Sequence, residues 1–398
     1  MSKKKILFLH PNFPAQFKNI CLDFSSQGHD VAFLCQTHYG RKIPGVLRLC
    51  MKGDISMEKL DEEKLGGAKR CHKTAEQFRK AFISFETKYW KPDIVISHSG
   101  WGCGVNVKEI WPSCFFIAYS EWWFEPTSQA YKYDPLNQYL NMNSKIISAQ
   151  WSRNMYSSLE LSTADRIVSP TNWQKNQLPA NLRMNCEVIF DGINSEQFKP
   201  NLSKRKEVVV TYGTRGMEPL RMFPQFIRQI PGILKRFPSA RFEIAGEDRI
   251  CYGGKKPDSH DTWGKWAQEF LSEMKIGEEK VIWLGYLNPK NYIDWLQRSM
   301  CHVYLSHPFV ISWSYVEALT SGCPIVASDI YGVREFGEKY QHQVNLIDHR
   351  VAENIADGVL NTLEKYEILH QKPEYTNALN EYSISTCIPK WRKLARLL

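Results

Sequence analysis

Several features that would mark a specialised class of protein are missing from this 398-residue sequence. No repeat of fixed period and no low-complexity tract is visible, which excludes a solenoid or a disordered chain as the main architecture. The longest apolar runs, such as Cys114 to Tyr119, are far shorter than the ~20 residues that a membrane-spanning helix needs. We therefore expect a globular protein without a membrane span.

Cysteine motifs are also missing. The 11 cysteines include no Cys-x-x-Cys pair and none at zinc-finger spacing from a histidine. An odd number at irregular positions indicates reduced, mostly buried thiols and hence a cytosolic compartment. The basic start, Met1 to Lys5, is followed by too few apolar residues for a secretory signal peptide. These absences predict a cytoplasmic location.

Acidic side chains are in the minority. The chain has 42 Asp and Glu against 51 Lys and Arg, a formal net charge of +9. Such an excess suits an anionic partner, which could be a phosphorylated small molecule, an acidic lipid surface or a nucleic acid. It equally fits a basic surface that only aids solubility, so the charge alone does not choose among these partners.

Short β-branched runs that alternate with helical stretches fill the chain. The first half predicts a helix from about Gln16 to Gln27 and strands at Ile6–Leu9, Val31–Cys35, Asp93–Ser97, Cys114–Tyr119, Arg166–Val168 and Cys186–Ile189. After a polar break the pattern restarts, with a helix at Pro224–Phe237 and strands at Val208–Tyr212, Arg241–Gly246, Val281–Leu284, His302–Leu305 and Pro324–Ala327. This alternation predicts an α/β protein with two parallel-sheet domains.

The break sets the domain boundaries. We predict an N-terminal Rossmann-like domain at 1–195, a linker at 196–206, a C-terminal Rossmann-like domain at 207–380 and a final helix at 381–398. Ligands of such sheets bind outside the carboxyl ends of the strands, so the cleft between the domains is the expected active site.

A basic, glycine-containing segment follows the first strand of the second half. Gly213 and Thr214 precede Arg215, and Arg221 comes six residues later. Gly213 lets a ligand approach the backbone closely, and guanidinium groups bind phosphate in a forked geometry. Together they could stabilise a departing diphosphate. A basic turn that pairs with surface carboxylates is the alternative.

A second segment follows the strand that ends at Leu305. Ser312 is a good N-cap type, so a helix is expected to begin there, and the amides around Ser312 and Trp313 would favour a phosphate. Glu317 then falls more than a turn into the helix, where its carboxylate could accept hydrogen bonds from ribose hydroxyls. A solvent-facing helix glutamate is the alternative.

These segments, in this order, resemble the donor domain of the retaining glycosyltransferases of group 1, which have the GT-B fold. The match includes Glu317-Ala318-Leu319 and the run from Gly322 to Ser328. The resemblance implies two Rossmann-like domains that face each other across a cleft and a C-terminal helix that crosses back to the first domain. It implies that Arg215 and Arg221 bind the donor diphosphate, that Glu317 holds the ribose, and that the co-substrate is a nucleoside diphosphate sugar.

The chain departs from the family pattern at two places. The first glutamate of the family pair, which contacts the transferred sugar, is replaced by Phe309. The N-terminal loop reads His10-Pro11-Asn12-Phe13-Pro14, which is similar to a subset of related bacterial enzymes. No Asp-x-Asp motif occurs, so we expect neither a metal nor another cofactor.

The first domain of this family binds the acceptor. Glu121 stands close to the position of a histidine that lies near the reaction centre in many members; beside tryptophans its pKa could be raised, and it could position an acceptor hydroxyl. His98, Asn12 and Trp122 are further acceptor-site candidates. The structural alternatives are a capping or core role for His98, a surface glutamate in a packed aromatic loop for Glu121, and domain core for the aromatic residues.

The resemblance implies a lipid-linked or surface glycan as the acceptor. The aromatic region Trp122 to Trp151 would suit sugar rings, and Lys390 to Lys393 would suit peripheral contact with the inner membrane face. A modified base in DNA is a weaker alternative, because no nucleic-acid motif is visible. A nucleotide-sugar epimerase and a non-catalytic nucleotide-sugar binder remain as alternatives of other classes.

Overall fold

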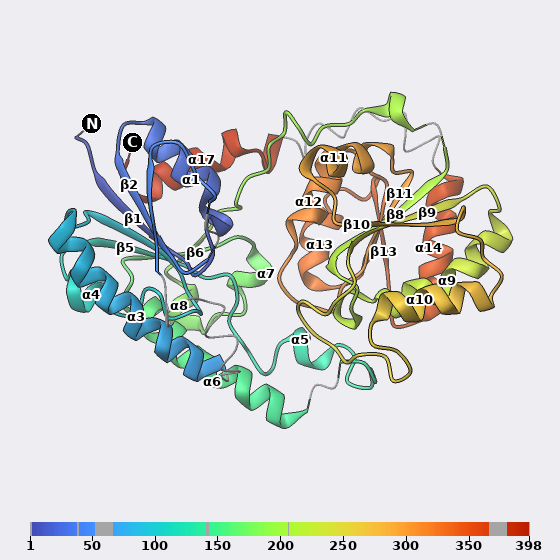
Figure 1. Cartoon of the computed structure of the whole chain (residues 1–398), viewed down its shortest axis with the longest axis horizontal. Coiled ribbons are helices and arrows are strands. Elements are labelled where there is room, and N and C mark those ends of the chain that lie inside the picture. Colours follow the sequence, from blue (N-terminus) through green and yellow to red (C-terminus); the bar gives the residue numbers. More distant parts are fainter. Residues whose placement is uncertain are drawn as a thin grey trace. The chain divides into compact units, whose positions relative to one another are not determined.

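The structure is a computed structural model that describes residues 2–37, 40–51, 67–140, 143–205, 207–365 and 380–397. Lys206, the last residue of the predicted linker, and Leu398 lie outside the described residues. The chain forms two compact units, traced in Figure 1. Unit 1 comprises Met1–Ser128, Asn143–Gly192 and Ile384–Leu398, and unit 2 comprises Gln129–Met142 and Ile193–Ser383.

Unit 1 is built on a seven-stranded parallel sheet of order β3-β2-β1-β4-β5-β6-β7. Chain order reverses between β1 and β4, so the carboxyl ends of these two strands are the point where such sheets bind ligands. The strands are β1 (Lys5–Leu9), β2 (Asp30–Cys35), β3 (Val46–Cys50), β4 (Ile94–His98), β5 (Phe115–Tyr119), β6 (Arg166–Ser169) and β7 (Cys186–Val188).

Successive side chains of β1 point to opposite faces of the sheet and so contribute to the two hydrophobic cores of unit 1. Ile6 and Phe8 point to the face covered by α1 and α17, whereas Leu7 and Leu9 point to the face covered by α3 and α6. The helices of unit 1 are η1 (Ala15–Phe17), α1 (Lys18–Ser26), α3 (Gly67–Lys88), α4 (Val107–Ile110), α6 (Ser144–Thr163), α7 (Asn172–Lys175), α8 (Ala180–Arg183) and α17 (Ile384–Leu394).

Unit 2 contains a six-stranded parallel sheet of order β10-β9-β8-β11-β12-β13. Here chain order reverses between β8 and β11, which places the expected ligand edge at their carboxyl ends. The strands are β8 (Val209–Gly216), β9 (Arg241–Glu247), β10 (Val281–Gly285), β11 (Cys301–Tyr304), β12 (Ile325–Ser328) and β13 (Val344–Ile347).

The core of unit 2 lies between its sheet and the helices α9, α10 and α14. Helix α9 buries Phe226, Ile227, Ile230, Ile233 and Leu234, at the spacing of one helical face. The helices of unit 2 are α5 (Gln129–Lys132), η3 (Leu202–Lys204), η4 (Pro219–Arg221), α9 (Phe223–Arg236), α10 (Trp263–Glu273), α11 (Pro289–Arg298), α12 (Trp313–Thr320), α13 (Tyr331–Gly337) and α14 (Ala352–Glu364).

Each predicted strand is present, with limits that shift by one or two residues in most cases. Two edge strands, β3 and β13, were not predicted, and β8 runs on to Gly216 instead of ending at Tyr212. All 11 cysteines are free of disulfides, and most of them are buried. In the part of the chain that the structure describes, no helix combines the length and the apolar character needed to cross a bilayer.

Candidate functional site

Arg221 lies at the expected ligand edge of unit 2. It ends η4, directly after β8, and its side chain is buried, with 5% of its surface exposed. One guanidinium nitrogen donates to Ser306 Oγ at 2.8 Å, and the Tyr252 ring lies 5.3 Å from the guanidinium carbon. Ser306 follows β11, so Arg221 bridges the two strands at which chain order reverses.

Arg215 occupies a different environment. It is the seventh residue of β8, and its side chain is exposed. Among the described residues no ion pair involves Arg215. The two arginines that the sequence groups together are therefore unlike in the structure, because one is fixed by packing whereas the other keeps its full set of donors for an outside group.

Two glycines of this segment, Gly213 and Gly216, lie in close contact with other parts of unit 2. A Cβ atom on Gly213 would lie 2.6 Å from the Trp295 ring, and one on Gly216 would lie 2.4 Å from the Arg249 carbonyl oxygen. The absence of a side chain at these positions is thus required by close internal packing. Thr214 lies in the same stretch, with its carbonyl oxygen against Gly246.

Glu218 organises the wall beside Arg221. It is fully buried, and its Oε2 accepts hydrogen bonds from the backbone amides of Cys251, Tyr252 and Gly253 at 2.7, 2.7 and 3.2 Å. Three amide donors hold a carboxylate strongly. Glu218 thereby fixes the loop that presents Tyr252 to Arg221, a role that the sequence did not reveal.

Helix α12 begins where the sequence predicts. Ser312 is its N-cap and accepts a hydrogen bond from the amide of Ser314, and Trp313 is the first helical residue, with 40% of its surface exposed. The amide of Tyr315 donates to the Ser312 carbonyl oxygen at 3.1 Å. Because the start of a helix carries partial positive charge, this end of α12 suits an anion.

Glu317 lies one turn into α12. Tyr292, on α11, donates to its Oε2 at 2.9 Å. Burial raises the pKa of Glu317 to about 7, although the hydrogen bond from Tyr292 opposes this shift. Phe309 lies on the loop before α12, with its ring 6.3 Å from that of Tyr252. An apolar ring therefore stands where the family pattern has a carboxylate.

Unit 1 gathers a second polar cluster at its own ligand edge. His98 is the last residue of β4, and Glu121 follows β5 by two residues. His98 Nε2 lies 3.5 Å from Glu121 Oε2, and Gln16 donates to Glu121 Oε1 at 2.7 Å. The other ring nitrogen of His98 lies 2.9 Å from the Ser99 carbonyl oxygen.

The charges of this pair correct one expectation. Burial would lower the pKa of His98, but the contact with Glu121 raises it above its usual value. Burial would likewise raise the pKa of Glu121, but its contacts with His98 and Gln16 lower it instead. The raised pKa expected for Glu121 was wrong, because the sequence does not show that a histidine lies beside the carboxylate. The contact therefore favours the charged form of both side chains.

The N-terminal loop packs against this pair. The His10 ring lies 4.7 Å from that of His98, and His10 Nδ1 accepts a hydrogen bond from the amide of Asn12 at 2.7 Å. Asn12 Oδ1 accepts from Thr37 Oγ1 at 2.7 Å. Trp122 is half-buried and its ring lies 5.9 Å from that of Trp173. Asn12 and His98 are therefore in one cluster, whereas Trp122 contacts a neighbouring aromatic residue.

A buried carboxyl group that the sequence did not single out completes the cluster. Glu160, on α6, is fully buried, and Ser97 Oγ donates to its Oε1 at 2.5 Å. Burial raises the pKa of Glu160 to about 7. Gln16 and Glu160 were missed because a lone Gln or Glu on a helical stretch carries no sequence signal of its own.

Residues Gln129–Met142 pack with unit 2, although the sequence assigned them to the first domain. The Tyr133 ring lies 5.9 Å from that of His307 and 5.2 Å from that of His349. Tyr139 accepts a hydrogen bond from Arg228 and packs 5.2 Å from Trp263. Part of the aromatic region expected at the acceptor site is thus packed with unit 2 instead.

The C-terminal segment also differs from expectation. Trp391 is completely buried in the core of unit 1, and Arg392 donates to Asp23 at 2.8 Å. Trp391 is therefore part of the core of unit 1 and not of its surface. The expected membrane contact of the basic side chains from Lys390 to Lys393 stays a prediction.

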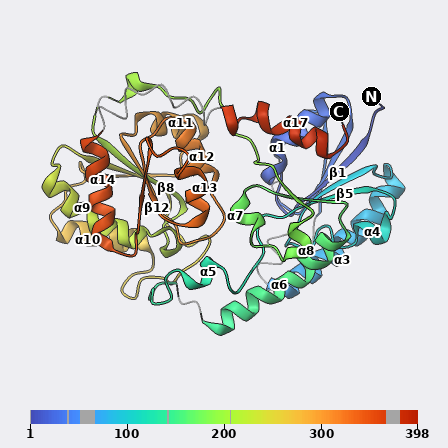
Figure 2. The ribbon, with the colours of Figure 1, turned by 180° about the vertical axis from the view of Figure 1, so that it is seen from behind.

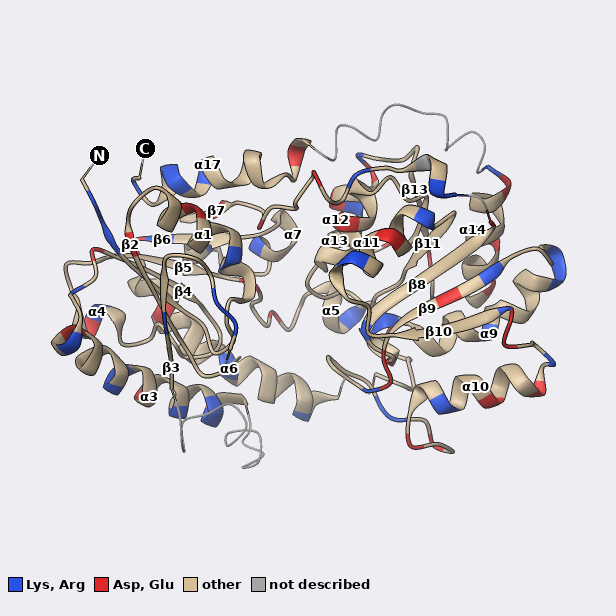
Figure 3. Cartoon of the chain, turned by 45° about the horizontal axis from the view of Figure 1, so that its top comes forward, with Lys and Arg blue, Asp and Glu red and all other residues tan. Residues whose placement is uncertain are grey.

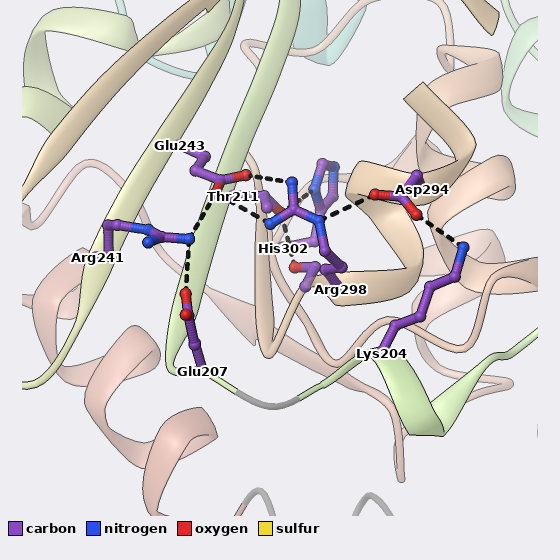
Figure 4. Close-up of polar contacts among 9 residues, drawn as sticks. Lys204, Glu207, Thr211, Arg241, Glu243, Asp294, Arg298 and His302 are labelled. Carbon is purple, nitrogen blue, oxygen red and sulfur yellow. Dashed lines mark hydrogen bonds and ion pairs between the residues drawn. The ribbon is translucent and has the colours of Figure 1, made fainter. Parts of the chain in front are cut away.

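A network of charged side chains lies near the amino ends of the unit 2 strands, away from the expected ligand edge. Figure 4 shows Glu243 between Arg241 and Arg298, and Asp294 between Arg298 and Lys204. Glu243 is only 3% exposed, and its carboxylate oxygens accept hydrogen bonds from Arg241 and Arg298 at 3.0 to 3.1 Å. These side chains pair with one another near the amino ends of the strands. The ion pairs thereby link η3 to α11 and α11 to the sheet. Across the described residues, no group of His, Cys, Asp and Glu is arranged to hold a metal ion.

The chain matches two family models of glycosyltransferases. Residues 193–381 match the family model of the glycosyl transferases group 1, and residues 27–198 match that of the glycosyl transferase family 4 group. Among curated proteins, none matches the chain in sequence.

Solved structures resemble the chain over its whole length. A sucrose-phosphate synthase from Thermosynechococcus elongatus is 15% identical, with 99% of this chain and 98% of that chain covered and a TM-score of 0.72. HepE of Anabaena, solved with UDP and glucose, is 14% identical, with 99% and 100% covered and a TM-score of 0.69. A glycosyltransferase from Rickettsia africae is 14% identical, with 100% and 98% covered and a TM-score of 0.68. These likenesses confirm the GT-B fold.

Proposed function

We propose that this chain, whose two halves match family models of glycosyltransferases, moves a sugar from a nucleoside diphosphate sugar to a hydroxyl group, with retention at the anomeric carbon. One observation gives this proposal its main support. The buried Arg221 joins the carboxyl ends of β8 and β11, and the chain continues from β11 into a capped helix that bears Glu317.

Negative charge develops on the diphosphate as it leaves, and it is the main contribution to the activation free energy that the proposed donor site has to lower. Arg221 and the first amides of α12 supply fixed positive charge at the ligand edge, and Arg215 adds an exposed guanidinium group. Such groups need no reorganisation when the anomeric C–O bond breaks, so they act on the transition state. Glu317 would accept hydrogen bonds from the ribose hydroxyls.

The acceptor hydroxyl would bind in unit 1 beside His98 and Glu121. The ionised carboxylate of Glu121 can accept a hydrogen bond from this hydroxyl, while His98 and Gln16 keep the carboxylate in one orientation. The acceptor class that fits the family and the basic surface is a lipid-linked or surface glycan. Donor class is best supported by HepE of Anabaena, which binds UDP and UDP-glucose.

Ligand binding tests the donor half directly. The melting temperature of the full chain is measured with UDP, GDP, ADP and their sugars, with and without EDTA. We expect a rise with one nucleotide family that EDTA leaves unchanged. Arg221→Ala and Glu317→Ala should abolish the rise, whereas Arg236→Ala and Glu364→Ala, which change exposed residues on α9 and α14, should keep it.

Product analysis separates the possible activities. A transferase gives free nucleoside diphosphate and a glycosylated acceptor whose anomeric configuration matches that of the donor. A new nucleotide sugar without acceptor would identify an epimerase, and tight binding without turnover would identify a binding module. We expect Arg215→Ala to lower turnover by about 10²–10³-fold; near-normal turnover of this variant would contradict the proposed role of Arg215.

A further inference from the structure

Helix α6 carries an apolar stripe on its outer side. Trp151, Met155 and Leu159 are 47%, 62% and 49% exposed. They stand four residues apart, so they lie on one face of the helix and extend over about 12 Å of its axis. We name these three residues the α6 stripe. Large apolar side chains that gather on one exposed face mark an interaction site more often than isolated ones do.

The polar groups beside the stripe are already satisfied. The hydroxyl groups of Ser152, Ser158 and Ser162 donate to backbone carbonyl oxygens three or four residues earlier in the helix, at 2.8, 2.7 and 3.1 Å. A hydroxyl group bonded in this way makes little demand on water. The only acidic residue of α6, Glu160, is buried, so the outer face of this helix presents no carboxylate.

The neighbouring helix adds positive charge on the same side of unit 1. Helices α3 and α6 contact each other and cover the same face of the sheet, so their outer faces look the same way; they lie side by side in Figures 1 and 2. Figure 3 shows blue basic residues along α3 and a mostly tan α6. Together the 22 residues of α3 and the 20 of α6 contain eight Lys and Arg against three Asp and Glu, a net charge of +5 out of the +9 of the chain.

We infer that the α6 stripe and the basic outer face of α3 dock this protein on an anionic phospholipid membrane. Apolar side chains enter the boundary between headgroups and acyl chains, while lysines meet the lipid phosphates. A second copy of the chain fits less well, because a symmetric contact through this face would bring two surfaces of like charge together. The inference concerns where the protein binds and does not depend on the proposed transfer reaction.

Vesicle binding tests this surface. The full chain is sedimented with vesicles of phosphatidylcholine alone and with vesicles that also contain phosphatidylglycerol. We expect binding only to the anionic vesicles. The double variant Met155→Ser with Leu159→Ser should bind at least about tenfold more weakly. Met184→Ser, which changes an 81% exposed methionine elsewhere on unit 1, should bind like the parent chain.

Charge is tested separately. Lys69→Glu with Lys80→Glu, two exposed lysines of α3, should weaken binding to anionic vesicles at least about tenfold, because each basic side chain near the lipid contributes about fivefold. Lys235→Glu with Lys290→Glu alters the net charge equally, on unit 2, and should have a smaller effect. Quenching of tryptophan fluorescence by brominated lipid should be lower in Trp151→Phe, a variant that keeps an aromatic ring.

Three results would overturn the inference. They are an absence of binding to anionic vesicles, equal binding by the parent and the stripe variant, and a concentration-dependent dimer that the stripe variant abolishes, as seen by light scattering. Melting temperatures of the variants verify that they fold. Failure of the transfer reaction would leave the vesicle result intact, and nucleotide-induced shifts should be the same in parent and variants.

Discussion

Glu317 is a carboxyl group whose charge changes in the physiological range. Burial against α11 raises its pKa to about 7. Below this pH the folded protein holds a neutral carboxyl group, which accepts hydrogen bonds less well than a carboxylate. The same burial therefore makes the proposed ribose contact depend on pH.

We predict that an intact nucleotide sugar binds more weakly as the pH falls from 8 to 6. If only the ionised form of Glu317 binds the ribose, the dissociation constant should rise about tenfold over this range. Titration calorimetry of the parent chain and of Glu317→Gln at three pH values measures the effect. The variant should bind weakly at every pH; an equal pH dependence in both proteins would assign the effect to another group.

His98 and Glu121 each favour the charged form of the other, against the effect of burial. The contact with Glu121 raises the pKa of His98 against the effect of burial. In Glu121→Gln we therefore expect a neutral His98 at pH 7 and a kcat that is about 10²-fold lower, with unchanged affinity for the donor. NMR titration of the His98 ring, together with steady-state kinetics, measures both. Glu109→Gln, at an exposed site that pairs with Arg79, is the control; a normal kcat in Glu121→Gln would remove Glu121 from the reaction.

At the scale of elements, packing explains why β8 carries a glycine in its interior. We predict that Gly213→Ala lowers the free energy of unfolding by about 1–3 kcal/mol, because the added methyl group meets the Trp295 ring. Gly232→Ala, at an exposed position of α9 with open space around it, should instead raise the free energy by about 0.5–1 kcal/mol. Chemical denaturation measures both changes. Equal effects at the two positions would show that helix and strand propensity, rather than contact with Trp295, decides the outcome.

The order of the elements was largely predictable, but two of the four edge strands, β3 and β13, were not. Strands such as Phe115–Tyr119 are almost completely buried and appear in the sequence as unbroken apolar runs. The edge strand β3 reads Val-Leu-Arg-Leu-Cys and is largely half-buried, and β13 contains an asparagine. A strand with one open side tolerates polar residues, so its sequence resembles that of a loop.

Side-chain roles at the site were predictable only where a local signal exists. Ser312 is a cap by its residue type and its position before an apolar run, and the structure confirms it. The contacts of Glu218 with residues 251–253, and of Glu121 with His98, join parts of the chain that are far apart in sequence. Without the fold, nothing in the sequence pairs them.

At the scale of the whole molecule, the course of the chain was the least predictable feature. Residues 129–140 pack with unit 2, although the chain on either side of this segment belongs to unit 1. His307 Nε2 lies 2.8 Å from the Ala130 carbonyl oxygen, and the amide of Lys255 donates to the Tyr139 carbonyl oxygen at 2.7 Å. Aromatic residues near a domain border carry the same sequence signal in either unit.

We predict that Tyr139→Ala destabilises unit 2 by about 2 kcal/mol, because it removes a half-buried ring between Arg228 and Trp263. Limited proteolysis should then cut within residues 129–142 more readily than in the parent chain. Leu136→Ala, at a residue of the same segment that is 92% exposed, is the matched control and should change neither quantity. Unaltered proteolysis of Tyr139→Ala would mean that this anchor does not hold the segment.

The packing of this segment with unit 2 also limits which chimeras of related proteins will work. Unit 2, the proposed donor unit, is not one continuous stretch of the chain, since residues 129–142 belong with residues 193–383 although 50 residues separate them. A chimera that exchanges only the C-terminal half with that of a relative would set Tyr133 and Tyr139 against a foreign surface. Donor specificity should be portable between relatives only when both stretches are transplanted together.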